Sequence, residues 1–131
     1  MVSNSITVSE RDMRRLSTLL DTSLTYRYPV ESARLGEVLA QASVSPDENV
    51  PAVVTMGATI FCTDAFGRTR ELSLVYPWDA DPFAGYVSVL SPIGIALLGL
   101  RPGQTVEYGD EEGAVHSLTV VDVVPSFSKA I

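Results

Sequence analysis

The first part of the chain carries its apolar residues at the spacing of an α-helix. Ser9 is placed to cap free amides, and Asp12 three residues later completes a capping-box pattern with Asp in place of the usual Glu. The apolar positions that follow lie on one stripe: Met13, Leu16, Leu20 and Leu24, with Leu19 beside it. This pattern predicts a first helix that begins at Ser9.

A second helix is predicted after Pro29, because proline suits the first helical position. Its apolar face comprises Leu35, Val38, Leu39 and Ala42. The gap from Thr22 to Tyr28 is short, so the two helices should lie antiparallel as a hairpin. Arms of about 15 residues would be roughly 22 Å long at 1.5 Å per residue. Packing, against each other or against the rest of the chain, is the simplest explanation of both stripes.

The hydrophobic pattern changes near Ser43–Pro51. The segment SVSPDENVP carries two prolines and three consecutive polar residues, a composition typical of a linker. Beyond it, β-branched runs are broken by Gly, Pro and Asp. We therefore expect an N-terminal helical hairpin over residues 1–46, a short coiled coil, and a second domain over residues 47–131.

The second region is predicted to contain several strands and one short helix. A turn is expected at Asp64–Gly67 and a polar loop at Pro77–Pro82, and Ser91 and Pro92 are suited to open a helix that Gly99 closes. Because strands outnumber helices and most connections suit antiparallel pairing, the sequence favours the α+β class. The expected strands are Val53–Cys62, Arg70–Tyr76, Tyr86–Leu90, Thr105–Tyr108 and Ala114–Val124.

Composition and charge narrow the function classes. The 131 residues are 46% hydrophobic and 19% charged, as expected for a globular protein. A net charge of −7 argues against a domain that binds phosphate backbones by general electrostatics, so we expect no direct sequence-specific nucleic-acid binding. The longest apolar stretch, around Ile93–Leu100, is too short to span a bilayer, and the first residues lack a secretory signal. We expect a soluble cytoplasmic protein without membrane association.

The residues able to carry chemistry form no catalytic or metal-binding motif. Cys62 and His116 both fall in predicted strands, where a small buried thiol and a surface imidazole explain them better than a nucleophile–base pair. Asp79 and Asp81, or the cluster Asp110–Glu112, could hold a hard cation weakly, but turns favour Asp for backbone reasons alone. We predict no catalytic residue, no metal site and no cofactor.

The loop around the single tryptophan is the main aromatic feature of the sequence. Trp78 stands among prolines in YPWDADPF, next to Asp79 and Asp81. Such a loop is either a contact surface or a lid over one end of the core, and the sequence alone leaves both interpretations open.

The second region resembles the C-terminal domain of the GreA/GreB transcript-cleavage factors. The resemblance rests on SPIGIALLGLRPGQTVEY, in which a helix of the form SP-x-x-x-ALLG is followed by glycine turns and strands. The segments VPAVVTMGATIF, LSLVYPWDAD and GYVSVLSPIGIALLGL further resemble the Rnk subgroup, the regulators of nucleoside diphosphate kinase, which have a shortened coiled coil. The resemblance to this family covers residues 50–124 well and residues 5–45 more loosely.

This resemblance implies an FKBP-like fold, in which a curved antiparallel sheet wraps one helix. It also implies a non-enzymatic regulator that docks on RNA polymerase near the secondary channel and competes there with Gre-type factors. The matching docking residues are Ser91 and Pro92, which are equally well explained as helix-start residues.

Two other functions stay open at this stage. A cleavage-stimulating factor would need acidic side chains at the hairpin tip to help hold a second metal ion. The predicted tip has no adjacent acidic pair; its notable residues are Asp21, Tyr26, Arg27, Tyr28 and Glu31. An FKBP-like binding or isomerase module is suggested by fold analogy alone. The oligomeric state is not predicted, since exposed leucines on a short hairpin could pair two chains.

Overall fold

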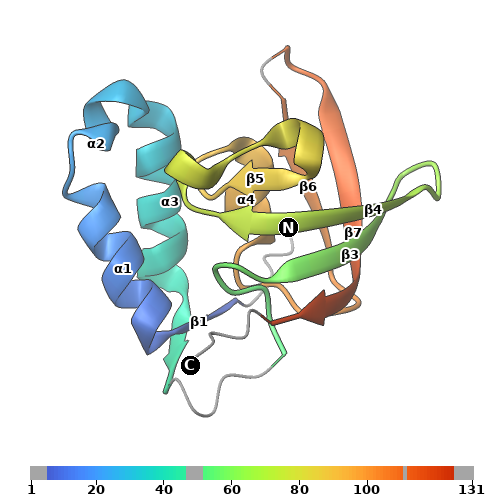
Figure 1. The fold of residues 1–131 in the computed structure, drawn as a ribbon, viewed down its shortest axis with the longest axis horizontal. Coiled ribbons are helices and arrows are strands. Elements are labelled where there is room, and N and C mark those ends of the chain that lie inside the picture. The colour runs from blue at the N-terminus through green and yellow to red at the C-terminus, as the bar shows by residue number, and fades with distance from the viewer. Residues whose placement is uncertain (1–5, 47–51, 111, 126–131) are drawn as a thin grey trace.

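A curled five-stranded sheet forms one side of the molecule, and the N-terminal helices pack beside it (Figure 1). The computed structural model describes residues 6–46, 52–110 and 112–125. The α+β class predicted from the sequence is confirmed. The sheet has the order β5-β4-β3-β7-β6. Its strands are β3 (Thr59–Asp64), β4 (Thr69–Val75), β5 (Tyr86–Ser88), β6 (Thr105–Gly109) and β7 (Val115–Val124).

Antiparallel pairing dominates this sheet, as the short connections predicted. Strand β3 pairs with β4 and β7, and β7 pairs with β6, all antiparallel. Strand β5 instead runs parallel to β4. The two connecting 3₁₀ turns, η2 (Pro77–Asp79) and η3 (Pro82–Ala84), carry the chain from β4 back to the start of β5. The predicted last strand before the helix, Tyr86–Leu90, ends earlier, at Ser88.

The predicted strand over Val53–Cys62 was wrong at its start, because β3 begins only at Thr59. Val53 and Val54 are buried without joining a strand. The Val54 backbone instead pairs with the segment after the short helix, donating to the Leu100 carbonyl at 2.9 Å and accepting from Gly99 N–H at 2.9 Å. A buried segment without strand pairing has the same run of apolar residues as a central strand. The hydrophobic pattern alone therefore does not distinguish a buried loop from a strand at Val53 and Val54.

The N-terminal segment contains α1 (Glu10–Leu20), the single turn α2 (Leu24–Arg27) and α3 (Pro29–Gln41). Ser9 caps α1 as predicted, its hydroxyl accepting from the Asp12 N–H at 3.0 Å. Helix α3 runs back beside α1 (Figure 1). With 11 and 13 residues, α1 and α3 are about 17 and 20 Å long, shorter than the arms expected from the sequence.

The predicted linker at residues 43–51 was wrong in its first part. Ser43–Ser45 forms strand β2, which pairs in parallel with β1 (Thr7–Ser9) and so joins the two ends of the helical segment. Strands this short have no measurable period in sequence, and their pairing depends on a partner far along the chain. Of the rest of the predicted linker, Pro46 joins no strand, and residues 47–51 lie outside the described residues.

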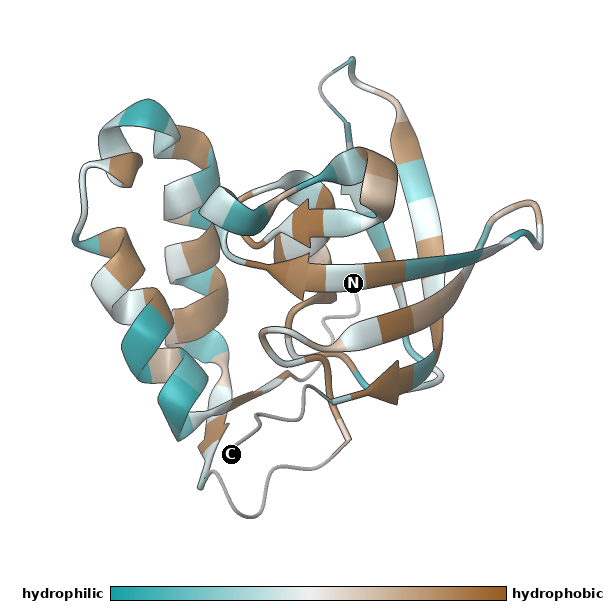
Figure 2. Cartoon of the chain, in the orientation of Figure 1, coloured by the Kyte–Doolittle hydropathy of each residue, from teal (hydrophilic) through white to brown (hydrophobic). Residues whose placement is uncertain are grey.

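One hydrophobic core joins the helices to the sheet. Leu16 and Leu35 have no exposed surface, and they belong to the same buried cluster as the sheet residues Ile60 and Leu74. Hydrophilic residues dominate the first turns of α1, and hydrophobic ones its end (Figure 2). Leu19, not Leu20, is the fully buried leucine in the last turn of α1. The helices therefore pack back onto the sheet, a point on which the sequence was silent.

Candidate docking surfaces

The start of α4 (Pro92–Leu97) is locked by a serine and a glycine. The Ser91 hydroxyl accepts from Gly94 N–H at 3.1 Å and donates to the Ser88 carbonyl at 2.6 Å. Pro92 occupies the first helical position, which confirms the predicted helix start. A Cβ at Gly94 would approach the Ser88 carbonyl oxygen to 1.9 Å, so only glycine fits. Ser91 and Pro92 are half-buried, with part of each surface in contact with solvent.

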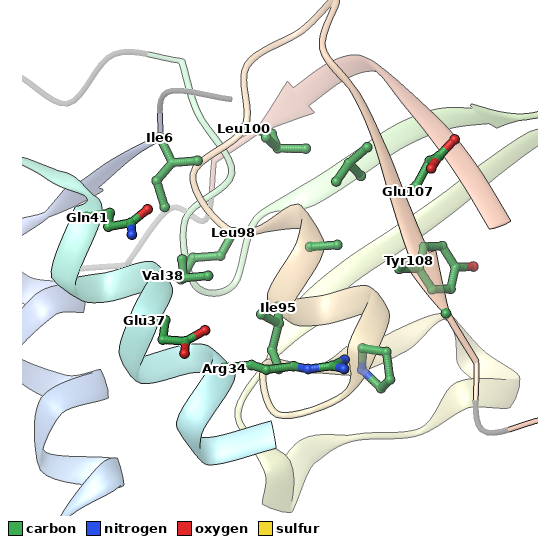
Figure 3. Close-up of a pocket in the computed structure, with 14 residues that line it drawn as sticks. Ile6, Arg34, Glu37, Val38, Gln41, Ile95, Leu98, Leu100, Glu107 and Tyr108 are labelled. Atoms are coloured by element: carbon green, nitrogen blue, oxygen red, sulfur yellow. The ribbon is translucent and has the colours of Figure 1, made fainter. Parts of the chain in front are cut away.

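A groove of about 630 Å³ opens beside Pro92, between α3, α4 and β6. Figure 3 shows its interior, where Val38 of α3 faces Ile95 and Leu98, and Arg34 extends toward α4. Tyr108 of β6 lines the opposite side. The groove thus combines an apolar floor with charges of both signs, because Glu37 and Glu107 line it together with Arg34. Sequence reasoning named Pro92 but missed this surface, whose walls come from three separate segments.

The tip of the helical segment is exposed and carries no adjacent pair of carboxylates. Asp21 is the C-cap of α1, whereas Glu31 lies in the first turn of α3. Between them, Tyr26 is 87% exposed, and the Arg27 guanidinium lies 5.9 Å from the ring centroid of Tyr28. The tip is therefore aromatic and mixed in charge.

The loop after β4 presents an aromatic stack to solvent. The rings of Tyr76 and Trp78 are 5.2 Å apart and nearly parallel, with an interplanar angle of 4°. Trp78 remains 68% exposed, which favours the contact-surface interpretation over a lid on the core. Asp79 and Asp81 are also exposed. The Asp81 backbone exchanges two hydrogen bonds with Tyr86, at 2.9 and 3.0 Å, which holds the loop against β5.

The environment of Tyr76 is unusually polar for a half-buried ring. Burial raises the pKa of the Tyr76 hydroxyl, the Asp12 carboxylate raises it further, and the Arg15 guanidinium partly offsets both. The hydroxyl itself is buried and makes no hydrogen bond of good geometry to the described residues. This places the base of the aromatic stack against charged side chains of α1.

Cys62 and His116 do not come together. Cys62 lies opposite Val120 and Arg70 in the sheet, whereas His116 pairs with Tyr108. Burial raises the pKa of the Cys62 thiol, which makes it a poor nucleophile. His116 Nε2 lies 2.8 Å from a carboxylate oxygen of Asp110.

The acidic turn between β6 and β7 is organised around Asp110. Its carboxylate accepts the Glu112 and Ala114 N–H groups, each at 2.9 Å, in addition to the contact with His116. Glu111 lies outside the described residues. Over residues 6–46, 52–110 and 112–125, no three His, Cys, Asp or Glu side chains gather as metal ligands would. The backbone role that turns give to Asp therefore accounts for Asp110.

Asp12 is a structural residue whose tertiary role the sequence did not reveal. Its side chain is buried, and its carboxylate accepts the Met56 N–H at 2.9 Å across 44 residues of sequence. The capping-box position explains the Asp12 backbone contact with Ser9, but no local signal indicates Met56. Asp12 thereby fixes the start of α1 to the segment that leads into β3.

Comparison with known proteins identifies the second region. Residues 49–125 match the family model of the C-terminal domain of the transcription elongation factors GreA and GreB. The chain belongs to the GreA/GreB family. The matched GreA/GreB region contains the whole five-stranded sheet and α4, so it includes the Trp78 loop and the α4 and β6 walls of the groove beside Pro92. The α3 wall of that groove lies outside the matched region.

Individual GreA/GreB relatives extend this likeness to most of the chain. The regulator of nucleoside diphosphate kinase of Escherichia coli K12 is 30% identical over 119 residues, which cover 90% of this chain and 88% of the relative. The elongation factor GreA of Syntrophobacter fumaroxidans is 31% identical over 81 residues, 61% of this chain and 51% of the relative. These relatives are named as regulators or elongation factors.

Solved structures agree with this assignment. A GreA/GreB elongation factor from Nitrosomonas europaea is 35% identical, with a TM-score of 0.76 over 92% of this chain and 100% of that chain. Gfh1 of Thermus thermophilus, 18% identical with a TM-score of 0.51 over 93% of this chain and 100% of that chain, shares the fold alone. Among the helices that the structure describes, none has the length and apolar character to cross a bilayer.

Proposed function

We propose that this chain is a non-enzymatic transcription regulator that binds RNA polymerase near the secondary channel and competes there with Gre-type factors. Its family membership supports a role in transcription, since its relatives are named as elongation factors and as a regulator. In this proposal residues 47–131 form the docking domain, FKBP-like in layout. Residues 1–46 form a short helical hairpin.

The observation that carries the proposal is the contrast between the family domain and the helices beside it. The SP-x-x-x-ALLG element is present with its serine cap, its proline and an adjoining groove. Helices α1 and α3, in contrast, have only 11 and 13 residues and share the core of the sheet. The chain thus combines a candidate docking groove beside Pro92 with two helices, α1 and α3. These helices are too short to carry acidic side chains far from that groove.

Binding to core RNA polymerase tests the proposal, with Pro92 as the probe of the docking surface. Pro92→Ala removes a ring that lines the groove but keeps a good helix former at the first helical position. We expect the Pro92→Ala chain to bind about ten-fold more weakly, as for a residue at the centre of an interface. Pro82→Ala is the matched control, because Pro82 also opens a helical turn, η3, but lines none of the grooves described here. Absence of wild-type binding at micromolar concentrations would refute the proposal.

A transcript-cleavage assay on stalled elongation complexes separates this proposal from a Gre-type cleavage factor. We expect no shortening of the transcript at saturating protein, because Asp21 and Glu31 belong to different helices and do not form an adjacent pair. If shortening occurs and is lost in Asp21→Asn or Glu31→Gln, the chain is a cleavage factor and the non-enzymatic proposal is wrong.

A further inference from the structure

A second groove, distinct from the one beside Pro92, lies between α1 and the Trp78 loop. It is a wide, open depression with a volume of about 900 Å³, and the residues that matter for its chemistry are Arg14, Arg15, Leu19, Leu24, Tyr76 and Trp78. We call it the arginine–aromatic groove. Leu19 is buried in the core and Leu24 is half-buried, so they form an apolar floor. Trp78, backed on one face by Tyr76, forms the opposite wall.

The charge of this groove is opposite to that of the chain as a whole. Among the residues that the structure describes, two arginines line it and no carboxylate does, although the net charge of the chain is −7. The other grooves mix the two signs: Glu37 and Glu107 line the one beside Pro92, and Asp12 and Asp79 line a neighbouring pocket. The arginine–aromatic groove is therefore suited to a ligand that is both acidic and apolar.

The polar groups of the groove favour a protein segment over a nucleic acid. The Thr18 hydroxyl already donates to the Arg14 carbonyl at 3.0 Å, and the Thr22 hydroxyl donates to the Leu19 carbonyl at 2.7 Å. Few side-chain groups are left to read base edges, and the acidic chain repels a phosphate backbone. Trp, Tyr and Arg are the residues most enriched at the energetic centres of protein interfaces.

We propose that the arginine–aromatic groove binds an acidic segment of RNA polymerase in which a large apolar side chain stands next to a carboxylate. The apolar side chain packs between Leu24 and the exposed face of Trp78, and the carboxylate pairs with Arg14 and Arg15. This inference rests on the proposed polymerase binding and adds a second contact to it, separate from Pro92. Bridging α1 and the Trp78 loop, the partner would hold the helical segment against the sheet.

Affinity measurements with core RNA polymerase test the electrostatic half of the proposal. Arg14→Glu should weaken binding about ten-fold or more, because it places like charges together. Its matched control is Arg101→Glu, an exposed arginine that lines none of the grooves described here. If Arg14→Glu and Arg101→Glu bind as tightly as the wild type, the second contact is disproved while polymerase binding stands. If the wild-type chain does not bind, both proposals fall.

Hydroxyl-radical footprinting tests the aromatic half. Trp78, 68% exposed in the free chain, should become protected in the complex with polymerase. Phe66, 82% exposed on the β3–β4 turn, should stay as reactive as before and so serves as the internal control. Unchanged reactivity of Trp78 in the complex would overturn the proposal. Protection by single-stranded RNA alone, or by raising the concentration of the free chain, would overturn it too, by assigning the groove to nucleic acid or to a second copy.

Discussion

The helical segment and the sheet of this protein are held in place by different kinds of interaction. The sheet is secured by continuous backbone ladders, with β3 paired on both of its edges. Over the described part of the chain, no such ladder joins the helical segment to the five-stranded sheet. The helical segment is attached by leucines that enter the common core, by the Asp12–Met56 hydrogen bond and by a contact between Thr7 N–H and the Gly99 carbonyl at 3.4 Å. The helices are therefore packed into the common core, whereas their tip around Tyr26 is exposed to solvent.

The largest effect on the free energy of unfolding is expected from substituting the leucines that join the helices to the sheet. Leu35→Ala removes a side chain with no exposed surface and should lower the free energy of unfolding by about 2–5 kcal/mol. Because helices and sheet share one core, helix content and Trp78 fluorescence should be lost in a single denaturant transition. Val30→Ala, at an exposed site of α3, should change stability little. A separate early loss of helix signal would show instead that the two regions unfold independently.

A smaller effect is expected from the hydrogen bond between the regions. Asp12→Ala leaves the Met56 N–H without its acceptor and should cost about 1–3 kcal/mol in a denaturant titration. Asp12→Asn, which keeps a carbonyl acceptor, should cost less. Glu10→Gln in the same helical turn is the control, since Glu10 is exposed. Equal stability of the alanine variant and the wild type would mean that this bond does not fasten α1.

The smallest effect on stability is expected from two carboxylates, Asp64 and Asp110, in turns of the sheet. Backbone N–H donation from Arg68 lowers the pKa of Asp64, and the His116 side chain lowers the pKa of Asp110. A carboxyl with a lowered pKa stabilises the fold above its ordinary value of 3.8, and this contribution disappears as the pH falls through the folded pKa. The melting temperature should therefore fall less steeply on acidification below about pH 4 in Asp110→Asn than in the wild type. Identical slopes for Asp110→Asn and the wild type would contradict a stabilising role of the Asp110 carboxylate.

Local sequence signals predicted the elements whose cause is local. The Ser9 cap and the Ser91–Pro92 helix start both follow from residues within a few positions of one another. The missed features depend on distant partners. Three-residue strands such as β1 and β2 have no period to detect, and nothing near Asp12 indicates that it meets Met56.

The candidate surfaces likewise divide into residues that the sequence could predict and grooves that only the structure shows. Pro92 and Trp78 could be named from the sequence because their types and neighbours are distinctive. The grooves beside them could not, because Arg34 and Arg14 come from helices whose packing against the sheet only the structure shows. Exposed arginines of a helix look alike in sequence, whether they face solvent or the rim of a groove.

We propose that this GreA/GreB-family chain occupies the polymerase site of Gre-type factors without their activity. The most direct measurement is a competition titration, in which unlabelled chain is added to a fluorescent Gre-type cleavage factor bound to a stalled elongation complex. The account predicts that the chain displaces the factor and suppresses transcript shortening, with Pro92→Ala needing about ten-fold more protein for the same displacement. A complex that keeps the factor, and continues to shorten its transcript, in the presence of a large excess of the chain would contradict it.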